Sequence, residues 1–227
     1  MTQPLPGRRD VPDIVVLTFP SARELRRRAP RLVLGILLLG AGIATVLEAR
    51  LGVAPWDVFH QGIADRTGIS FGVVTILVGL VVLLVWIPLR QRFGLGTVVN
   101  TLTLGLVINA ALALIPTVDA LPVRWAMLVG GIVVGAAGMA GYIGAGLGPG
   151  PRDGLMTALA ARGHPLWLVR TAIEVSVLVV GIVLGGDVGI GTVLFAFGIG
   201  PVGHWFLARL HLGVGGADPD PAATIGE

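Results

Sequence analysis

A charged pair within a long apolar stretch is the first feature of this chain that could do chemistry. Glu174 follows Leu166, where the stretch begins, by about half the 20 residues that cross a bilayer, so its carboxylate falls near the membrane centre. Burial there is costly, and a partner or a water cavity is expected. Arg170, one turn earlier, shares the same helix face. A structural ion pair, a protonated glutamate and a proton or cation site all fit, and we favour the last.

Two aspartates occupy matching positions in two predicted short helices. Asp57 follows Pro55 by two residues, and Asp153 follows Pro151 in the same way. An acidic residue after a helix-starting proline complements the helix dipole, so a purely structural role explains the pattern well. The functional alternative is that both short helices enter the membrane from opposite faces. Their N-termini and carboxylates would then meet at a solute or cation path.

Other polar residues in the apolar stretches carry weaker signals. Asn109 and His204 match in the repeat described below, and both are candidates for the path if the two halves pack about a two-fold axis. Such groups usually form hydrogen bonds between helices, worth about 0.6 kcal/mol on average. His60 is expected to be an exposed loop histidine. Nowhere does the sequence show metal-ligand spacing.

An internal repeat organises these residues. L-G-V-A-P-W-D from Leu51 recurs as L-G-P-G-P-R-D from Leu147, a shift of 96 residues, and G-L-G-T-V from Gly94 recurs as G-I-G-T-V from Gly189, a shift of 95. The paired positions are Gly52, Pro55, Trp56 and Asp57 with Gly148, Pro151, Arg152 and Asp153, and Gly96 and Thr97 with Gly191 and Thr192. Any site at Trp56 and Arg152 is therefore asymmetric, although an Arg152–Asp153 pair in the cytoplasmic headgroup layer also fits. The threonines are predicted to cap the helices that follow.

Six apolar stretches are long enough for membrane spans, which need about 20 residues. Five of them are Ile69–Leu89, Leu95–Ile115, Trp125–Ala145, Leu166–Leu184 and Ile190–Leu207, and the sixth, Leu32–Leu47, is shorter but can extend through Ala49. Each repeat contributes three spans and one short helix, and the odd number of spans inverts the second repeat relative to the first. The fourth stretch carries regularly spaced glycines from Gly131 to Gly144, which favour close helix packing.

Arginine placement predicts the orientation. All 16 basic residues are Arg, and seven of them lie within the first 31 residues. Twelve fall on the side of the N-terminus and three on the other side, with Arg170 uncounted inside a span, which predicts that both termini are cytoplasmic. We divide the chain into an Arg-rich tail (1–30), two repeats (31–116 and 122–210) and a short disordered tail (211–227). The basic end of the first tail, Ser21 to Ala29, is expected to form a helix against anionic lipid headgroups.

Composition excludes several classes of protein. Hydrophobic residues make up 54% of the chain and charged residues only 13%, against about a quarter in soluble domains, so lipid must solvate much of the surface. Cysteine is absent, which excludes disulfides, thiolate metal sites and cysteine nucleophiles. No recognisable hydrolase motif is present. We expect neither an enzyme nor a cofactor, and no nucleic-acid partner.

The Pro-Trp-Asp and Gly-x-Gly-Thr segments, together with the six-span layout, resemble the YczE/YitT group of bacterial membrane proteins. The resemblance covers roughly residues 32–210. It implies an inner-membrane protein built of repeated helical units and implies little about activity.

We therefore predict an all-α, polytopic membrane protein with two inverted repeats. The leading hypothesis is a small-solute or ion transporter or channel that uses Asp57, Asp153 and Glu174. The competing hypothesis is a membrane scaffold that docks a cytoplasmic partner through its Arg-rich arm. A homo-oligomer is compatible with both. A polar cavity beside Glu174, with both short helices pointing inward, would favour transport, whereas a dry core packed with glycine would favour the scaffold.

Overall fold

The structure, a computed structural model, describes residues 20–209, and this part of the chain is all-helical. In this range eight helices follow one another: α1 (Ala22–Ala49), α2 (Pro55–Thr67), α3 (Phe71–Leu89), α4 (Leu95–Leu114), α5 (Leu121–Gly144), α6 (Pro151–Ala160), α7 (Leu166–Val183) and α8 (Ile190–Arg209). Most of the predicted N-terminal tail and all of the predicted C-terminal tail lie outside it. Six of these helices, all except α2 and α6, are long and apolar enough to cross a membrane, which confirms the predicted fold class.

The first helix begins earlier than its apolar stretch. α1 starts at Ala22, so the basic segment predicted as a separate surface helix forms the first turns of α1. Ser21 and Glu24 fix this start through a capping box. The Glu24 amide donates to the Ser21 hydroxyl at 3.3 Å, and the Ser21 amide donates to the Glu24 carboxylate at 3.0 Å.

Helices α1 and α5 form the closest-packed pair in the bundle. Glycines allow their backbones to touch. A Cβ atom added at Gly35 would lie 2.9 Å from the Gly138 carbonyl oxygen, and one at Gly42 would lie 2.7 Å from the Gly131 carbonyl oxygen. The packing role predicted for the α5 glycines is therefore confirmed.

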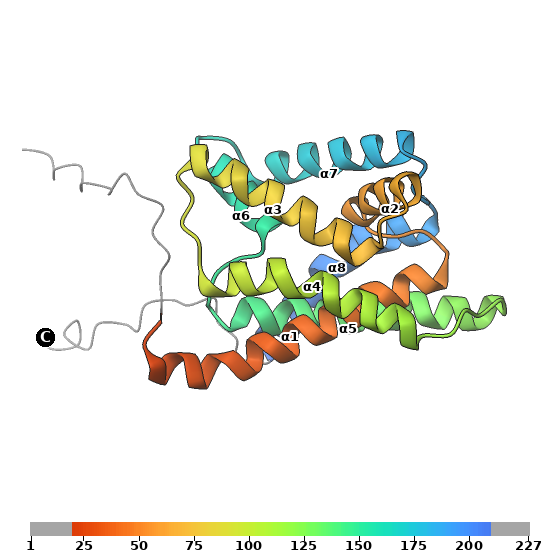
Figure 1. The fold of residues 1–227 in the computed structure, drawn as a ribbon, viewed down its shortest axis with the longest axis horizontal. Coiled ribbons are helices and arrows are strands. Elements are labelled where there is room, and N and C mark those ends of the chain that lie inside the picture. The colour runs from red at the N-terminus through yellow and green to blue at the C-terminus, as the bar shows by residue number, and fades with distance from the viewer. Residues whose placement is uncertain (1–19, 210–227) are drawn as a thin grey trace, which may run out of the picture.

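The chain runs back and forth along the long axis of the molecule, with α2 towards one end and α6 towards the other (Figure 1). Both short helices pack against the same two spans, α3 and α7. α4 packs against α1 in the same way as α8 packs against α5. These matched contacts support the inverted-repeat interpretation, in which α5–α8 correspond to α1–α4.

Each Gly-x-Gly-Thr turn holds the loop that leads into the short helix of the other half. The Gly96 amide donates to the Leu147 carbonyl at 2.7 Å, and the Gly191 amide donates to the Leu51 carbonyl at 2.7 Å. The two repeated motifs thus bind each other across the halves, and this contact anchors the entrance to both short helices.

The threonines of these turns behave differently. Thr97 does not cap α4, contrary to the prediction, because its buried hydroxyl donates to the Pro149 carbonyl at 2.7 Å and so supports the loop before α6. Thr192 is the third residue of α8, and its hydroxyl accepts a 3.2 Å hydrogen bond from the Gly189 amide, which is the reverse half of a capping box and not an N-cap. Gly148, at φ +123°, makes the left-handed turn beside Thr97, where a side chain would be strained.

The two halves differ where their last two spans meet. Gly72 of α3 and Gly105 of α4 lie in backbone contact, and the Gly72 amide donates to the Asn109 side chain at 2.9 Å. In the second half, the 95-residue shift places Trp167 in the position of Gly72, and a side chain added at Gly200 would have nothing within 4 Å. In the described structure, α7 therefore does not pack along α8 as α3 packs along α4.

Candidate functional site: a cavity between the two short helices

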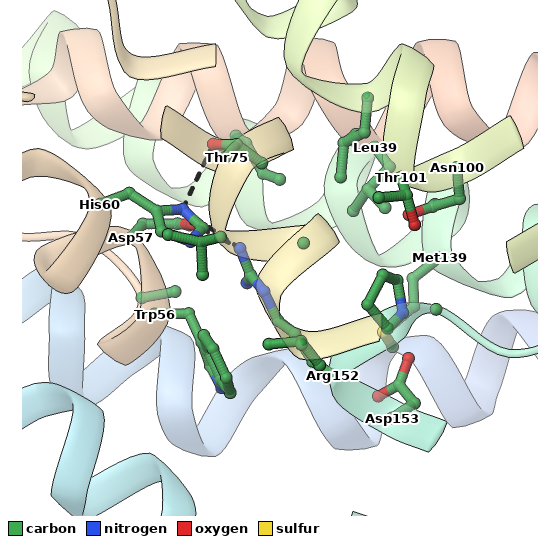
Figure 2. Close-up of a pocket in the computed structure, with 18 of the residues that line it drawn as sticks. Leu39, Trp56, Asp57, His60, Thr75, Asn100, Thr101, Met139, Arg152 and Asp153 are labelled. Atoms are coloured by element: carbon green, nitrogen blue, oxygen red, sulfur yellow. Dashed lines mark hydrogen bonds and ion pairs between the residues drawn. The ribbon is translucent and has the colours of Figure 1, made fainter. Parts of the chain in front are cut away.

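A cavity of about 150 Å³ lies beside the first turns of α2 and α6, with both halves of the chain in its wall. Much of the wall is apolar, including Leu39, Ile43, Val78, Val82, Leu104, Met139, Met156, Phe195 and Ile199. The polar part consists of Asp57, His60, Thr75, Asn100, Thr101, Tyr142, Arg152, Asp153, Arg170 and Glu174. In the view of Figure 2, the α2 residues lie on one side of the cavity and Asp153 on the other, with Arg152 extending between them.

The start of α2 is buried because α2 packs between α3 and α7. Pro55 occupies the first turn, where its missing amide costs no hydrogen bond. A side chain at Gly186, just after α7, would collide with the Val58 carbonyl, so glycine allows this approach. Asp57 is consequently 3% exposed and His60 1% exposed. The prediction of an exposed loop histidine is therefore wrong.

The start of α6 is held by a tryptophan of α3. The Trp86 indole is fully buried, and its Nε1 donates to the Pro151 carbonyl at 3.1 Å. A side chain at Gly154 would collide with the indole ring, so glycine makes room for it. This packing fixes the first turn of α6 at the cavity.

Arg152 reaches from α6 to α2. Its Nη2 lies 3.5 Å from Asp57 Oδ1 and 3.3 Å from His60 Nδ1, and its guanidinium lies 5.0 Å from the centre of the Trp56 ring. The arginine thereby supplies the positive charge that the buried Asp57 carboxylate needs and stacks over an aromatic face. The alternative of an Arg152–Asp153 pair at the headgroups is wrong, because neighbouring residues of a helix project about 100° apart and these two contact different partners.

Three groups surround the Nδ1 atom of His60. The Thr75 hydroxyl lies 3.2 Å, the Arg152 guanidinium 3.3 Å and the Asp57 carboxylate 3.7 Å from it, and which of them it bonds depends on the tautomer of the ring. In the described structure, the buried Nε2 of His60 and the buried Nε1 of Trp56 have no hydrogen-bond partner. Buried polar atoms are rarely left in this way, and the Trp56 indole N–H is a donor in every case. The α2 side of the cavity can therefore donate hydrogen bonds to water or to a solute.

Asp153 lies on the α6 side and has a different environment. The hydroxyl of Tyr142, the single tyrosine of the chain, donates to Asp153 Oδ2 at 2.7 Å. Among the described residues, no basic side chain forms an ion pair with Asp153. Asp57 and Asp153 are thus equivalent in the repeat but differ in charge compensation.

The charged pair of α7 reaches the edge of the cavity. Arg170 Nε donates to Glu174 Oε1 at 3.0 Å, which confirms the pairing expected from their spacing. The Glu174 side chain is mostly covered, whereas the Arg170 side chain is half-exposed. A cavity with a largely apolar wall and several polar groups therefore lies beside Glu174.

Two predicted path residues lie elsewhere. Asn109 does not line the cavity: its amide donates to the Ser70 hydroxyl at 2.9 Å and accepts from the Gly72 amide, so it ties α4 to the start of α3. His204 is exposed on α8, away from the cavity. Asn109 therefore forms hydrogen bonds between helices, which is the usual role of such a group.

Sequence reasoning did not select Thr75, Asn100 or Tyr142 as site residues. A usable signal exists for Tyr142, because a lone phenol within an apolar span must find a hydrogen-bond partner when buried. His60 follows Asp57 by three residues, so the spacing also predicts that both side chains share one helix face. Nothing in the local sequence distinguishes Thr75 from a threonine that faces lipid.

Comparisons with known proteins identify the family. Residues 26–208 match a family of unknown function (DUF6198), and the chain belongs to this family. An uncharacterised protein of Haemophilus influenzae is 40% identical over 177 residues, which cover 78% of this chain and 81% of that protein. The uncharacterised membrane protein YczE of Bacillus subtilis is 30% identical over 165 residues, which cover 71% of this chain and 77% of YczE, and confirms the resemblance to YczE. No solved structure matches the chain.

Proposed function

We propose that this membrane protein is a small-solute or ion transporter or channel whose path runs through the cavity between α2 and α6. The observation that carries the proposal is the contact between Arg152 and Asp57. It joins the first turns of two short helices that belong to opposite ends of the bundle. Helix ends at membrane depth are tolerated where they are buried in protein or line a water-filled cavity, and transporters commonly bind solutes at such a junction between repeats.

The proposal includes the cellular location and orientation. The excess of arginine on the side of the N-terminus supports a bacterial cytoplasmic membrane protein with both termini in the cytoplasm. In this orientation α2 enters from outside and α6 from the cytoplasm. The exposed Arg23, Arg26 and Arg27 on the first turns of α1 would then contact anionic headgroups of the inner leaflet.

Cysteine scanning of residues 54–64 and 150–160 tests the path. The native chain contains no cysteine, so each introduced thiol is unique. With a membrane-impermeant thiol reagent on sealed vesicles, we expect labelling along one face of each short helix, up to Asp57 in one and Asp153 in the other. The two helices should be labelled from opposite sides.

Two matched positions calibrate this scan. Leu84→Cys, on the exposed apolar surface of α3, should remain unlabelled in lipid, and His164→Cys, in the exposed loop after α6, should be labelled fully from one side. Labelling that stops at the solvent-facing end of both short helices would remove the path and favour the scaffold hypothesis.

A further inference from the structure

The charges that line the cavity do not balance. Three carboxylates and two guanidiniums reach it. Arg152 contacts Asp57, and Arg170 pairs with Glu174, so Asp153 is left without a basic partner in the described structure. His60 is counted as neutral, because its Nδ1 lies 3.3 Å from the Arg152 guanidinium, which would repel a second positive charge. The cavity therefore has one uncompensated negative charge, which belongs to Asp153.

The contacts of Asp153 leave part of its carboxylate available. Tyr142 donates to Oδ2 and orients the group, whereas no hydrogen bond from the described residues reaches Oδ1. Arg152 is next to it in the chain but points towards α2. The hydrogen bond from Tyr142 thus holds the Asp153 carboxylate at the cavity and leaves its Oδ1 atom available as an acceptor.

A second group near the α6 side also lacks a partner. Asn100 is 4% exposed and lines the same cavity, yet its side-chain amide forms no hydrogen bond with the described residues. Amide groups inside a protein normally find a hydrogen-bond partner, so this one is available to a solute in the cavity. Its oxygen can accept from the same solute that Asp153 attracts. Figure 2 shows Asn100 and Asp153 on α4 and α6 around this part of the cavity.

We propose that the cavity binds a small organic cation, a primary alkylammonium or a similar amine, with Asp153 as its counter-ion and Asn100 as a further acceptor. This inference rests on the proposed function and narrows its solute class. The apolar wall suits a hydrocarbon body. A volume of about 150 Å³ admits a molecule up to about the size of benzene.

A bare divalent cation fits the lining poorly. Mg²⁺ and Ca²⁺ need about six or more oxygen ligands in a defined geometry. The described side chains include no group of three His, Asp or Glu residues that could hold a metal ion. An ammonium group needs only a few acceptors and one carboxylate, which Asp153 and Asn100 supply.

Ligand-induced stabilisation of the purified full chain in detergent tests this assignment. Propylammonium should raise the unfolding temperature in a saturable manner, because a ligand that binds only the native state stabilises it. Propanol, its neutral counterpart, should not, and NaCl at the same ionic strength should not. Asp153→Asn should weaken the apparent affinity for propylammonium at least about tenfold, since the amide keeps the acceptor for Tyr142 but loses the charge.

Further variants separate binding from folding. Asn100→Ala should weaken affinity less than Asp153→Asn, and Tyr142→Phe should retain saturable binding because the carboxylate remains. Asp65→Asn, at an exposed position of α2 outside the cavity, is the matched control and should bind as the unaltered chain does.

Unaltered affinity in a folded Asp153→Asn protein would overturn the assignment. So would equal stabilisation by propanol or by Na⁺, or no saturable effect of propylammonium. None of these results depends on thiol labelling, so this inference and the proposed path can fail separately.

Discussion

At the scale of single residues, Trp56 and Arg152 locate the site within the molecule. They occupy equivalent positions of the repeat, and they contact each other at 5.0 Å. Their contact brings the first turns of α2 and α6 together at the cavity. Two tryptophans there would leave Asp57 buried without a positive charge, which is strongly unfavourable. The difference between Trp56 and Arg152 therefore supplies the positive charge that a buried Asp57 carboxylate needs.

Removing the arginine alone should destabilise the fold. Arg152→Gln leaves the buried Asp57 carboxylate unpaired, and we expect a loss of about 3 kcal/mol in the free energy of unfolding. Adding Asp57→Asn to the same chain should restore most of this loss, because the unpaired charge disappears. Reversible unfolding of the purified protein in mixed detergent measures both variants.

The matched control is Arg50→Gln, because Arg50 pairs with the fully exposed Asp119 at 3.8 Å. Exposed pairs of this kind contribute little, so this variant should unfold like the unaltered chain. If the double variant were as unstable as Arg152→Gln, the contact between the short helices would not be the source of the effect.

At the scale of elements, hydropathy and the positions of helix-starting prolines predict most of the architecture. The apolar stretches correspond to the six long helices, and Pro55 and Pro151 begin the short helices where the repeat predicts them. These features are local, since length, apolar composition and proline are properties of one segment. A basic helix over Ser21 to Ala29 was expected, but its continuation through Pro30 into the first span was not.

Features that depend on packing between distant segments were not predictable. His60 is buried because glycines of α7 and the following loop admit α2, and Thr97 turns away from its own helix to the loop before α6. Arg152 contacts Asp57 of α2 because the tertiary fold brings the first turns of α2 and α6 together, which the sequence alone does not show. The sequence identified Asp57, Asp153 and the Arg170–Glu174 pair as candidates, whereas their relation to one cavity required the tertiary fold.

The different packing of the last two spans gives a prediction at this scale. Gly105→Ala should destabilise the protein by about 1–3 kcal/mol, because its methyl group would be forced against the Gly72 backbone. The repeat supplies the control. Gly200→Ala, at the equivalent position of α8, has open space and should be neutral or slightly stabilising, since alanine favours helix. Thermal unfolding in one detergent compares the two, and equal destabilisation would contradict the asymmetric packing.

At the scale of the whole molecule, the two halves of the chain contact each other on both sides of the cavity. Each Gly-x-Gly-Thr turn holds the opposite loop, each short helix packs between α3 and α7, and Arg152 joins the two short helices in the middle. The close seam between α3 and α4 has no counterpart between α7 and α8 in the described structure. The two halves thus share the motif contacts but differ in how tightly their last two spans pack.

The most direct test of the path is whether one cavity residue can be reached from both sides of the membrane. Thr75 lines the cavity, is 7% exposed and is close in size to cysteine. Thr75→Cys, in sealed vesicles of each orientation, should react with an impermeant thiol reagent from either side, while Leu84→Cys reacts from neither. Reaction of Thr75→Cys from one side only, in a protein that unfolds normally, would make the cavity a pocket open to that side alone and contradict the transport account.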